Sequence, residues 1–254
     1  MRVALTVMVA CAVSMVFTGC EKIGFIGTDA CLGCHNGRYA PDRSEFPDSK
    51  HAEVGCEACH GGGYLHAAAG GTFGLFIDVP DASRATQHEF CGKCHENTVT
   101  EYLKSAHFAS KEVACLDCHE VHDENPLRLS IVDNALCLSC HKPYGFENDA
   151  AVSKHTFHDV DPAGTGASRC VNCHQPPLVR VNQAEGPHGH SMIPIQPKVS
   201  NEAIAAGITP TPPNSCAGIV GCHDGSNQYV PVFDVDSVED NTIVQAIYDS
   251  RYGV

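Results

Sequence analysis

Hydrophobic residues are concentrated at the start of the chain. Residues 3–17 are largely apolar, Arg2 precedes them, and two small residues lead to Cys20. This pattern is typical of a bacterial export signal that ends at a lipidated cysteine. We expect a lipoprotein-type signal over residues 1–19 and a tether over residues 20–30, with ordinary cleavage nearby as the alternative. No other stretch approaches the roughly 18 apolar residues of a membrane span, so a lipid on Cys20 is the one membrane contact expected.

The rest of the hydrophobic pattern predicts short helices separated by irregular chain. Residues 96–104 and 240–252 have helical spacing, and the second helix would be capped at Ser237 or at its own first residue. Residues 229–235 alternate enough to predict one short strand. Residues 191–215 are rich in proline and glycine, so we expect them to wrap the surface as a loop. The predicted fold is mostly irregular with short α-helices and little β structure.

The composition leaves the chain short of bulky core residues. It has no tryptophan, 7% aromatic residues, 23 glycines and 15 prolines in 254 residues, so another apolar component must complete the core. The formal net charge is −14. A chain this acidic, without a basic patch, is not expected to bind nucleic acid.

Cysteine and histidine recur together in a fixed pattern, Cys-x-x-Cys-His. This run attaches c-type haem: two thiols bond to the haem vinyl groups, and the adjacent histidine reaches the iron. The pattern occurs six times, as Cys31, Cys34 and His35; Cys56, Cys59 and His60; Cys91, Cys94 and His95; Cys115, Cys118 and His119; Cys137, Cys140 and His141; and Cys170, Cys173 and His174.

Zinc sites and disulfides are the competing interpretations of these cysteines. Paired Cys-x-x-Cys units also bind structural zinc, and exported chains form disulfides. Neither chemistry requires a histidine after every second cysteine, whereas haem attachment does. We therefore favour haem c as the cofactor at all six runs, with the porphyrins supplying the missing core.

A seventh cysteine pair departs from the pattern. Cys216 and Cys222 are separated by five residues, and His223 follows directly. Gly218 and Gly221 can adopt the backbone conformations that loop out extra residues. The alternative is a disulfide between the two cysteines. The retained terminal Cys-His favours a seventh haem.

Histidines outside the motifs are the candidates for the opposite face of each iron. Of the 16 histidines, seven follow a cysteine pair and nine do not. Three of the nine occur in a recurring Ser-x-His run between paired motifs, at His51, His107 and His155. Seven distal ligands would leave two spares, which we expect to be one of His155 and His158 and one of His188 and His190. The nine candidates are His51, His66, His88, His107, His122, His155, His158, His188 and His190.

The motif spacing also predicts the domain organisation. Two motifs with a Ser-x-His run between them repeat three times, which predicts a six-haem core over residues 31–190 built from three haem-pair units. Residues 191–254 would form a C-terminal region with the irregular seventh site and the terminal helix.

These motifs resemble those of the multihaem c-type cytochromes over about residues 31–177. The likeness is closest to the group with periplasmic and outer-membrane decahaem carriers, on the Ser-x-His run before Cys115 and on His122 after that motif. A second relative is the group of extracellular cytochromes that form filaments. The resemblance implies low-spin haems, each held by two histidines, with neighbouring porphyrin edges near contact.

Electron transfer without chemistry on a substrate is the first hypothesis. An iron ligated on both faces can change only its oxidation state. The expected partners are other cytochromes, quinol-linked donors and outer-membrane conduits, and the expected location is the periplasm or outer membrane, with access to the cell surface.

Two alternatives remain open from the sequence. One is a filament subunit in which histidines of neighbouring copies ligate shared haems. The other is a reductase with one open haem, for which the irregular site at His223 is the best candidate.

Overall fold

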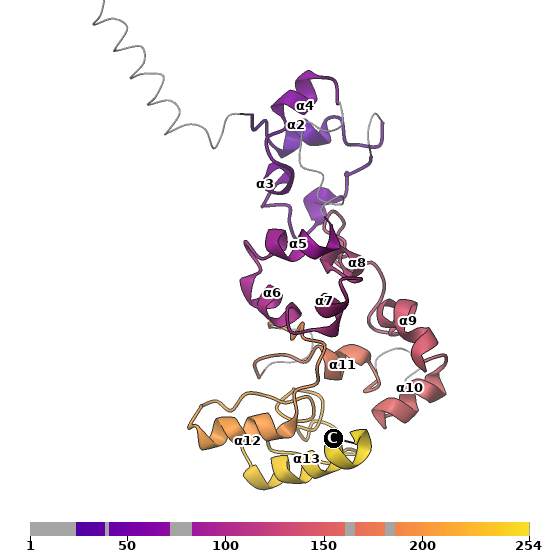
Figure 1. The fold of residues 1–254 in the computed structure, drawn as a ribbon, viewed down its shortest axis with the longest axis vertical. Coiled ribbons are helices and arrows are strands. Elements are labelled where there is room, and N and C mark those ends of the chain that lie inside the picture. Colours follow the sequence, from indigo (N-terminus) through magenta and orange to yellow (C-terminus); the bar gives the residue numbers. More distant parts are fainter. Residues whose placement is uncertain (1–23, 39–40, 72–82, 161–165, 181–185, 254) are drawn as a thin grey trace, which may run out of the picture. The chain divides into compact units, whose positions relative to one another are not determined.

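The computed structural model describes residues 24–38, 41–71, 83–160, 166–180 and 186–253 (Figure 1). The predicted signal and the start of the tether lie outside these residues. Within them, short helices are joined by irregular chain, and no strand is formed; extended pairing is limited to isolated bridges such as the antiparallel one between Pro177 and His188. The predicted fold class is therefore confirmed. No helix in this part of the chain has the length and apolar character needed to cross a membrane.

The helices are short, and most have only one or two turns. They are α2 (Thr28–Leu32), η1 (Phe46–Asp48), α3 (Cys56–His60), α4 (Tyr64–Ala68), α5 (Arg84–Cys91), α6 (Glu96–Tyr102), α7 (Ala106–Ser110), α8 (Cys115–Cys118), α9 (Ala135–His141), η2 (Lys142–Tyr144), α10 (Asp149–Thr156), α11 (Cys170–His174), α12 (Pro197–Ala205) and α13 (Val238–Tyr252).

The chain divides into two compact units. The first comprises Met1–Ser83 and His119–Pro126, and the second comprises Arg84–Cys118 and Leu127–Val254. The domain division predicted from motif spacing follows different boundaries and stays a prediction.

In the first unit, the Glu57 carboxylate joins the two helices that carry the first two motifs. It accepts hydrogen bonds from the backbone N–H groups of Ile26 (2.8 Å), Gly27 (2.9 Å) and Gly63 (2.9 Å). Glu57 lies in α3, whereas Ile26 and Gly27 lead into α2. One carboxylate thus satisfies three backbone donors and fixes how α2 and α3 approach each other.

In the second unit, α12 and α13 pack against each other around a polar centre. Asn214 and Ser200 are fully buried and Asn241 is 1% exposed. The Asn214 amide donates to the Ser200 hydroxyl (3.0 Å) and to Asn241 Oδ1 (3.1 Å), and its oxygen accepts from the backbone N–H of Cys216 and of Ala217 (both 2.9 Å). The helix pair is therefore tied directly to the loop that begins the irregular seventh motif.

The two longer helices predicted from the sequence are present. The first ends two residues early, at Tyr102. The second begins after Ser237, whose hydroxyl accepts from the Asp240 N–H (3.1 Å), and it ends at Gly253 in the left-handed conformation at φ 67°. Both ends of α13 thus follow the local capping chemistry expected from the sequence.

Two predicted elements are wrong. Residues 229–235 form no strand, because Pro231 lacks an N–H and the Phe233 N–H bonds to the His223 carbonyl (2.9 Å) within the same loop. Residues 191–215 are not all loop, since they contain α12. Pro197 occupies its first turn, where a missing N–H costs nothing.

Candidate haem sites

Short helices place the thiols and histidine of most motifs on one side. All of α3 and α11 is Cys-x-x-Cys-His, α9 ends at His141, and α8 spans Cys115–Cys118. Residues three and four positions apart lie on one face of a helix. The spacing of the motif therefore presents two thiols and an imidazole together.

The seventh motif is a loop instead of a helix. Gly218 and Gly221 have φ values of 82° and 87°, which glycine adopts without strain. A Cβ at Gly218 would lie 3.1 Å from Pro213 Cα and from a Val235 methyl group. The two glycines thus fold out the three extra residues, as expected. None of the 14 cysteines in the described chain forms a disulfide, so Cys216 and Cys222 are not cross-linked in this structure.

Two imidazoles that ligate one iron from opposite sides are separated by a fixed distance. Each metal–nitrogen bond is about 2 Å, and each ring centre lies about 1 Å behind its nitrogen, so the ring centres are about 6 Å apart. The rings can rotate about those bonds, so the distance is the criterion and the angle between ring planes is not. This separation tests whether the histidines fit the predicted cofactor.

In the first unit, two motif histidines lie opposite a histidine from outside the motifs. The ring centres of His35 and His66 are 6.2 Å apart, and those of His60 and His122 are 6.0 Å apart. His122 lies far from His60 in the sequence and reaches it through the segment His119–Pro126. Both pairs fit the spacing of two ligands on one iron.

In the second unit, three more motif histidines have such a partner. The separations are 5.8 Å for His107 and His141, 6.2 Å for His155 and His174, and 6.3 Å for His158 and His223. His155 and His158 thus lie opposite two different motif histidines, which does not support the expectation that one of them is spare.

The five pairs do not include the motif histidines His95 and His119. His51, His88, His188 and His190 remain as candidates, and the ligands of these two sites stay a prediction. Among the four, the His88 ring packs against Phe108, with ring centres 5.1 Å apart, and its buried Nδ1 makes no hydrogen bond.

Backbone carbonyls orient four motif histidines. In each, Nδ1 contacts a carbonyl oxygen, which can only accept, so Nδ1 must carry the hydrogen and Nε2 is left as the metal ligand. For three of these histidines, the residue that supplies the carbonyl is a proline six, seven or eight positions later in the chain. Sequence reasoning missed this signal. The contacts are His35 to Pro41 (3.3 Å), His119 to Pro126 (3.1 Å), His223 to Pro231 (2.8 Å) and His174 to Met192 (2.8 Å).

The serines of the recurring Ser-x-His run fix the chain next to the distal histidines. Ser105 is 2% exposed, and its hydroxyl accepts from the Phe108 N–H (3.0 Å) as the cap of α7, the helix that carries His107. The Ser49 hydroxyl accepts from the His51 N–H (3.2 Å). In these two runs, the serine forms a local turn that holds the histidine in place.

Burial favours the metal-binding form of three distal histidines. Burial first, and then a neighbouring charged group, lowers the pKa of His107, His122 and His155. In His107 and His155 that neighbour is the opposite motif histidine. A lowered pKa keeps the imidazole neutral, and only the neutral ring has a nitrogen lone pair for iron.

The cysteines of neighbouring motifs lie side by side. In each predicted haem-pair unit, the first cysteines of the two motifs are close enough for each thiol to affect the other: Cys31 and Cys56, Cys91 and Cys115, and Cys137 and Cys170.

Contacts between successive pairs continue this arrangement within the second unit. Burial and the nearby Cys137 thiol raise the pKa of Cys118 to about 11. Burial and the nearby Cys222 thiol likewise raise the pKa of Cys173 to about 11. The attachment sites of the second unit therefore follow one another in chain order, from the third motif to the seventh.

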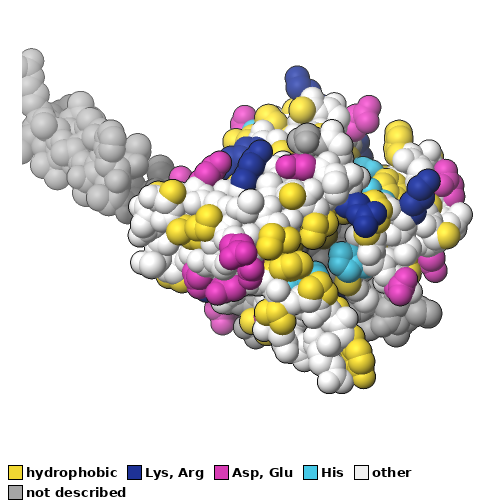
Figure 2. All heavy atoms as spheres, turned by 90° about the horizontal axis from the view of Figure 1, so that it is seen from below, with side chains coloured by type: hydrophobic (Ala, Val, Ile, Leu, Met, Phe, Trp, Pro, Cys, Tyr) yellow, Lys and Arg dark blue, Asp and Glu magenta, His cyan; other side chains and the backbone are white. Residues whose placement is uncertain are grey.

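The protein's own apolar core is small, which fits a bound porphyrin. Phe46, Ile219 and Val244 are buried, whereas Val220, Val232 and many other large apolar side chains are more than one-third exposed. Figure 2 shows apolar side chains on one face of the molecule among acidic ones. Haem would cover such surface with apolar ring atoms.

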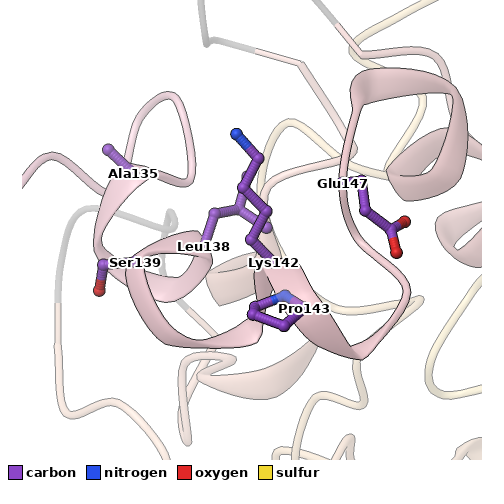
Figure 3. Close-up of a pocket in the computed structure, with 6 residues that line it drawn as sticks. All are labelled: Ala135, Leu138, Ser139, Lys142, Pro143 and Glu147. Carbon is purple, nitrogen blue, oxygen red and sulfur yellow. The ribbon is translucent and has the colours of Figure 1, made fainter.

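A hollow of about 370 Å³ opens beside His155. Apolar rings of Phe146, Phe157 and Tyr252 line it together with the cationic side chains of Lys154 and Arg251. Aromatic walls and positive groups suit a flat apolar ring that carries carboxylates. A second hollow, of about 610 Å³, lies on α9 and contains none of the predicted site residues (Figure 3); it is lined by Ala135, Leu138, Ser139, Lys142, Pro143 and Glu147.

Comparison with known proteins agrees with this chemistry. The family model described as "Doubled CXXCH motif" matches residues 107–157, and that of "Cytochrome c554 and c-prime" matches residues 18–61. The multiheme cytochrome MtrA of Shewanella baltica is 29% identical over 166 residues, which cover 59% of this chain and 46% of the relative.

Two further relatives have similar names. The C-type polyheme cytochrome OmcC of Geobacter sulfurreducens is 26% identical over 177 residues, covering 62% of this chain and 21% of the relative. The cytochrome c-type protein NrfB of Escherichia coli is 25% identical over 123 residues, covering 44% of this chain and 64% of the relative. The chain thus matches less than half of MtrA and about a fifth of OmcC. No solved structure matches it significantly.

Fold, site and comparisons together define a multihaem c-type cytochrome. Haem c is its cofactor. Within that class, the predicted resemblance to the group that includes the multiheme cytochrome MtrA is confirmed.

Proposed function

We propose that this protein relays electrons through about seven haem c groups, each ligated by two histidines. The observation that carries the proposal is the set of five histidine pairs, whose ring centres are 5.8–6.3 Å apart. The neighbouring cysteines of successive motifs add support, because electrons pass readily only between cofactors held close together.

The roles of the residues follow from this arrangement. The 14 motif cysteines tether the cofactor through thioether bonds, the motif histidines ligate one face, and the paired histidines ligate the other. Haem iron, when bound, supplies a one-electron change of oxidation state. Because imidazole closes both faces, these sites exclude water and substrate.

At the seventh motif, the histidine geometry favours haem over a disulfide. His158 lies opposite His223, and its Nδ1 bonds to the Thr156 carbonyl (2.7 Å), which orients Nε2 outward as in a metal ligand. The same geometry weighs against the reductase alternative, because His158 would close the face that a substrate needs.

The proposed partners are other redox proteins outside the cytoplasm: cytochromes or quinol-linked donors on one side, and outer-membrane or extracellular acceptors on the other. The export-type pattern before Cys20 supports this location, and a lipid on Cys20 would hold the protein at a membrane. The filament alternative differs from this proposal in assembly. If it holds, the purified protein would form polymers visible by electron microscopy.

The number and spin state of the haems test the proposal. We expect seven haems per chain from intact mass and pyridine haemochrome, and a ferric spectrum that is low-spin throughout. His155→Ala should convert one haem to high-spin, while Asp149→Asn, on the same helix α10, should leave the spectrum unchanged. A count of six would make Cys216 and Cys222 a disulfide, and an unchanged His155→Ala spectrum would remove that residue from the ligands.

A further inference from the structure

A carboxylate lies beside one of the paired histidines. Glu120 Oε1 is 3.5 Å from His122 Nδ1, and the two side chains are 27% and 23% exposed. The contact is at the long end of the range for an ion pair. Limited exposure reduces screening by water, so the charge acts on the ring more strongly than it would on the surface.

The backbone holds this carboxylate in place. Glu120 Oε1 also accepts from the N–H groups of Val121 (3.1 Å) and His122 (3.4 Å), so the side chain folds back over its own turn. The position next to the imidazole is therefore set by a local turn, in addition to the contact with the ring.

Other paired histidines have a neutral partner at the same nitrogen. Nδ1 of His35, His174 and His223 contacts a backbone carbonyl, and so does Nδ1 of His158. A carbonyl presents a dipole, whereas a carboxylate presents a full negative charge. A carboxylate at the outer nitrogen makes an imidazole a more basic ligand than a carbonyl does.

One opposing charge lies nearby. The Arg43 guanidinium acts on His122 in the opposite sense to Glu120, and burial and Arg43 together lower the pKa of His122 more than Glu120 raises it. Arg43 is exposed, with its Nη1 donating to the Asp42 carbonyl (2.8 Å). Water therefore screens its charge more than that of the partly buried carboxylate.

We propose that Glu120 tunes the reduction potential of the haem ligated by His60 and His122. Its negative charge makes His122 a stronger donor and favours the ferric iron, which carries one more positive charge than the ferrous iron. The potential is thereby lower than a neutral partner would give. The inference rests on the proposed function, in that His60 and His122 must ligate one haem.

Glu120→Gln tests the charge, because the amide keeps the shape and can still accept from the two backbone N–H groups. Full-length haem-loaded protein is titrated against redox mediators and followed by visible and EPR spectra. We expect one haem to become at least tenfold easier to reduce, about 59 mV for a one-electron couple, with haem count and spin state unchanged. Glu124→Gln, which removes an exposed charge from the same loop, should shift no haem by as much.

A separate variant distinguishes failure of the inference from failure of the proposed function. His122→Ala should yield one high-spin haem if His122 is a ligand. If it does so and Glu120→Gln shifts nothing, or shifts no more than Glu124→Gln, the tuning role is wrong. If His122→Ala stays fully low-spin, the ligand assignment itself fails. Glu120→Asp keeps the charge but moves it away from the His122 ring. It should shift the potential of the same haem in the same direction as Glu120→Gln, by a smaller amount.

Discussion

Replacing Asn214 with leucine should release the C-terminal helix pair from the seventh motif. The substitution keeps the branching and the number of heavy atoms of the side chain but removes four hydrogen bonds. Ser200 retains its bond to the Pro212 carbonyl (3.1 Å), and the backbone N–H of Cys216 is only partly buried. The N–H of Ala217 and Oδ1 of Asn241 are buried and would lose this partner.

The magnitude follows from those two groups. Each buried polar group left without a partner costs about 1–3 kcal/mol, so Asn214→Leu should destabilise this region by about 4 kcal/mol. At about 1.4 kcal/mol per factor of ten, the local opening equilibrium rises about a thousandfold. Haem occupancy at the seventh motif should also fall, because Asn214 positions the first residues of that loop.

Hydrogen exchange measured by mass spectrometry is the appropriate assay, because it reports local opening of α13 while the rest of the protein stays folded. Amides of α13 should exchange much faster in Asn214→Leu than in the wild type. Asn227→Leu, at an exposed asparagine of the same region, is the matched control. Protection of α13 within about threefold of the wild-type value would refute the predicted cost of the two unpaired groups. At RT of 0.59 kcal/mol, a threefold change in protection corresponds to a free-energy difference of under about 1 kcal/mol.

Two further predictions concern carboxylates. Arg180 and then Thr211 lower the pKa of Asp236 from 3.8 to about 2. A lowered pKa means that the contact stabilises the fold fully above pH 4 and loses its effect as the pH falls to 2. Acid melts of Asp236→Asn should therefore lack that part of the decline in stability. A decline equal to that of the wild type would contradict the assignment. Glu57→Ala removes three hydrogen bonds to the backbone and should destabilise the first unit by about 2 kcal/mol; equal proteolysis of wild type and variant at residues 24–71 would argue against it.

The sequence by itself indicated the cofactor and predicts where it attaches. Cys-x-x-Cys-His is a local signal, because two thiols and one imidazole within five residues suffice to bond one haem. The sequence also determined both ends of α13, since Ser237 and Gly253 act on neighbouring backbone groups. It did not reveal α12, because the proline that starts this helix is also a loop residue.

Only the tertiary structure decided which distal histidine faces which motif. His107 precedes the fourth motif yet lies opposite His141 of the fifth, and His122 follows the fourth motif yet lies opposite His60 of the second. Asn214 likewise acquires its role from neighbours that the fold supplies. The motif histidine directly follows the cysteines that tether the haem, so the sequence alone identifies it. The second ligand comes from another segment of the chain, and only packing brings that segment near the iron.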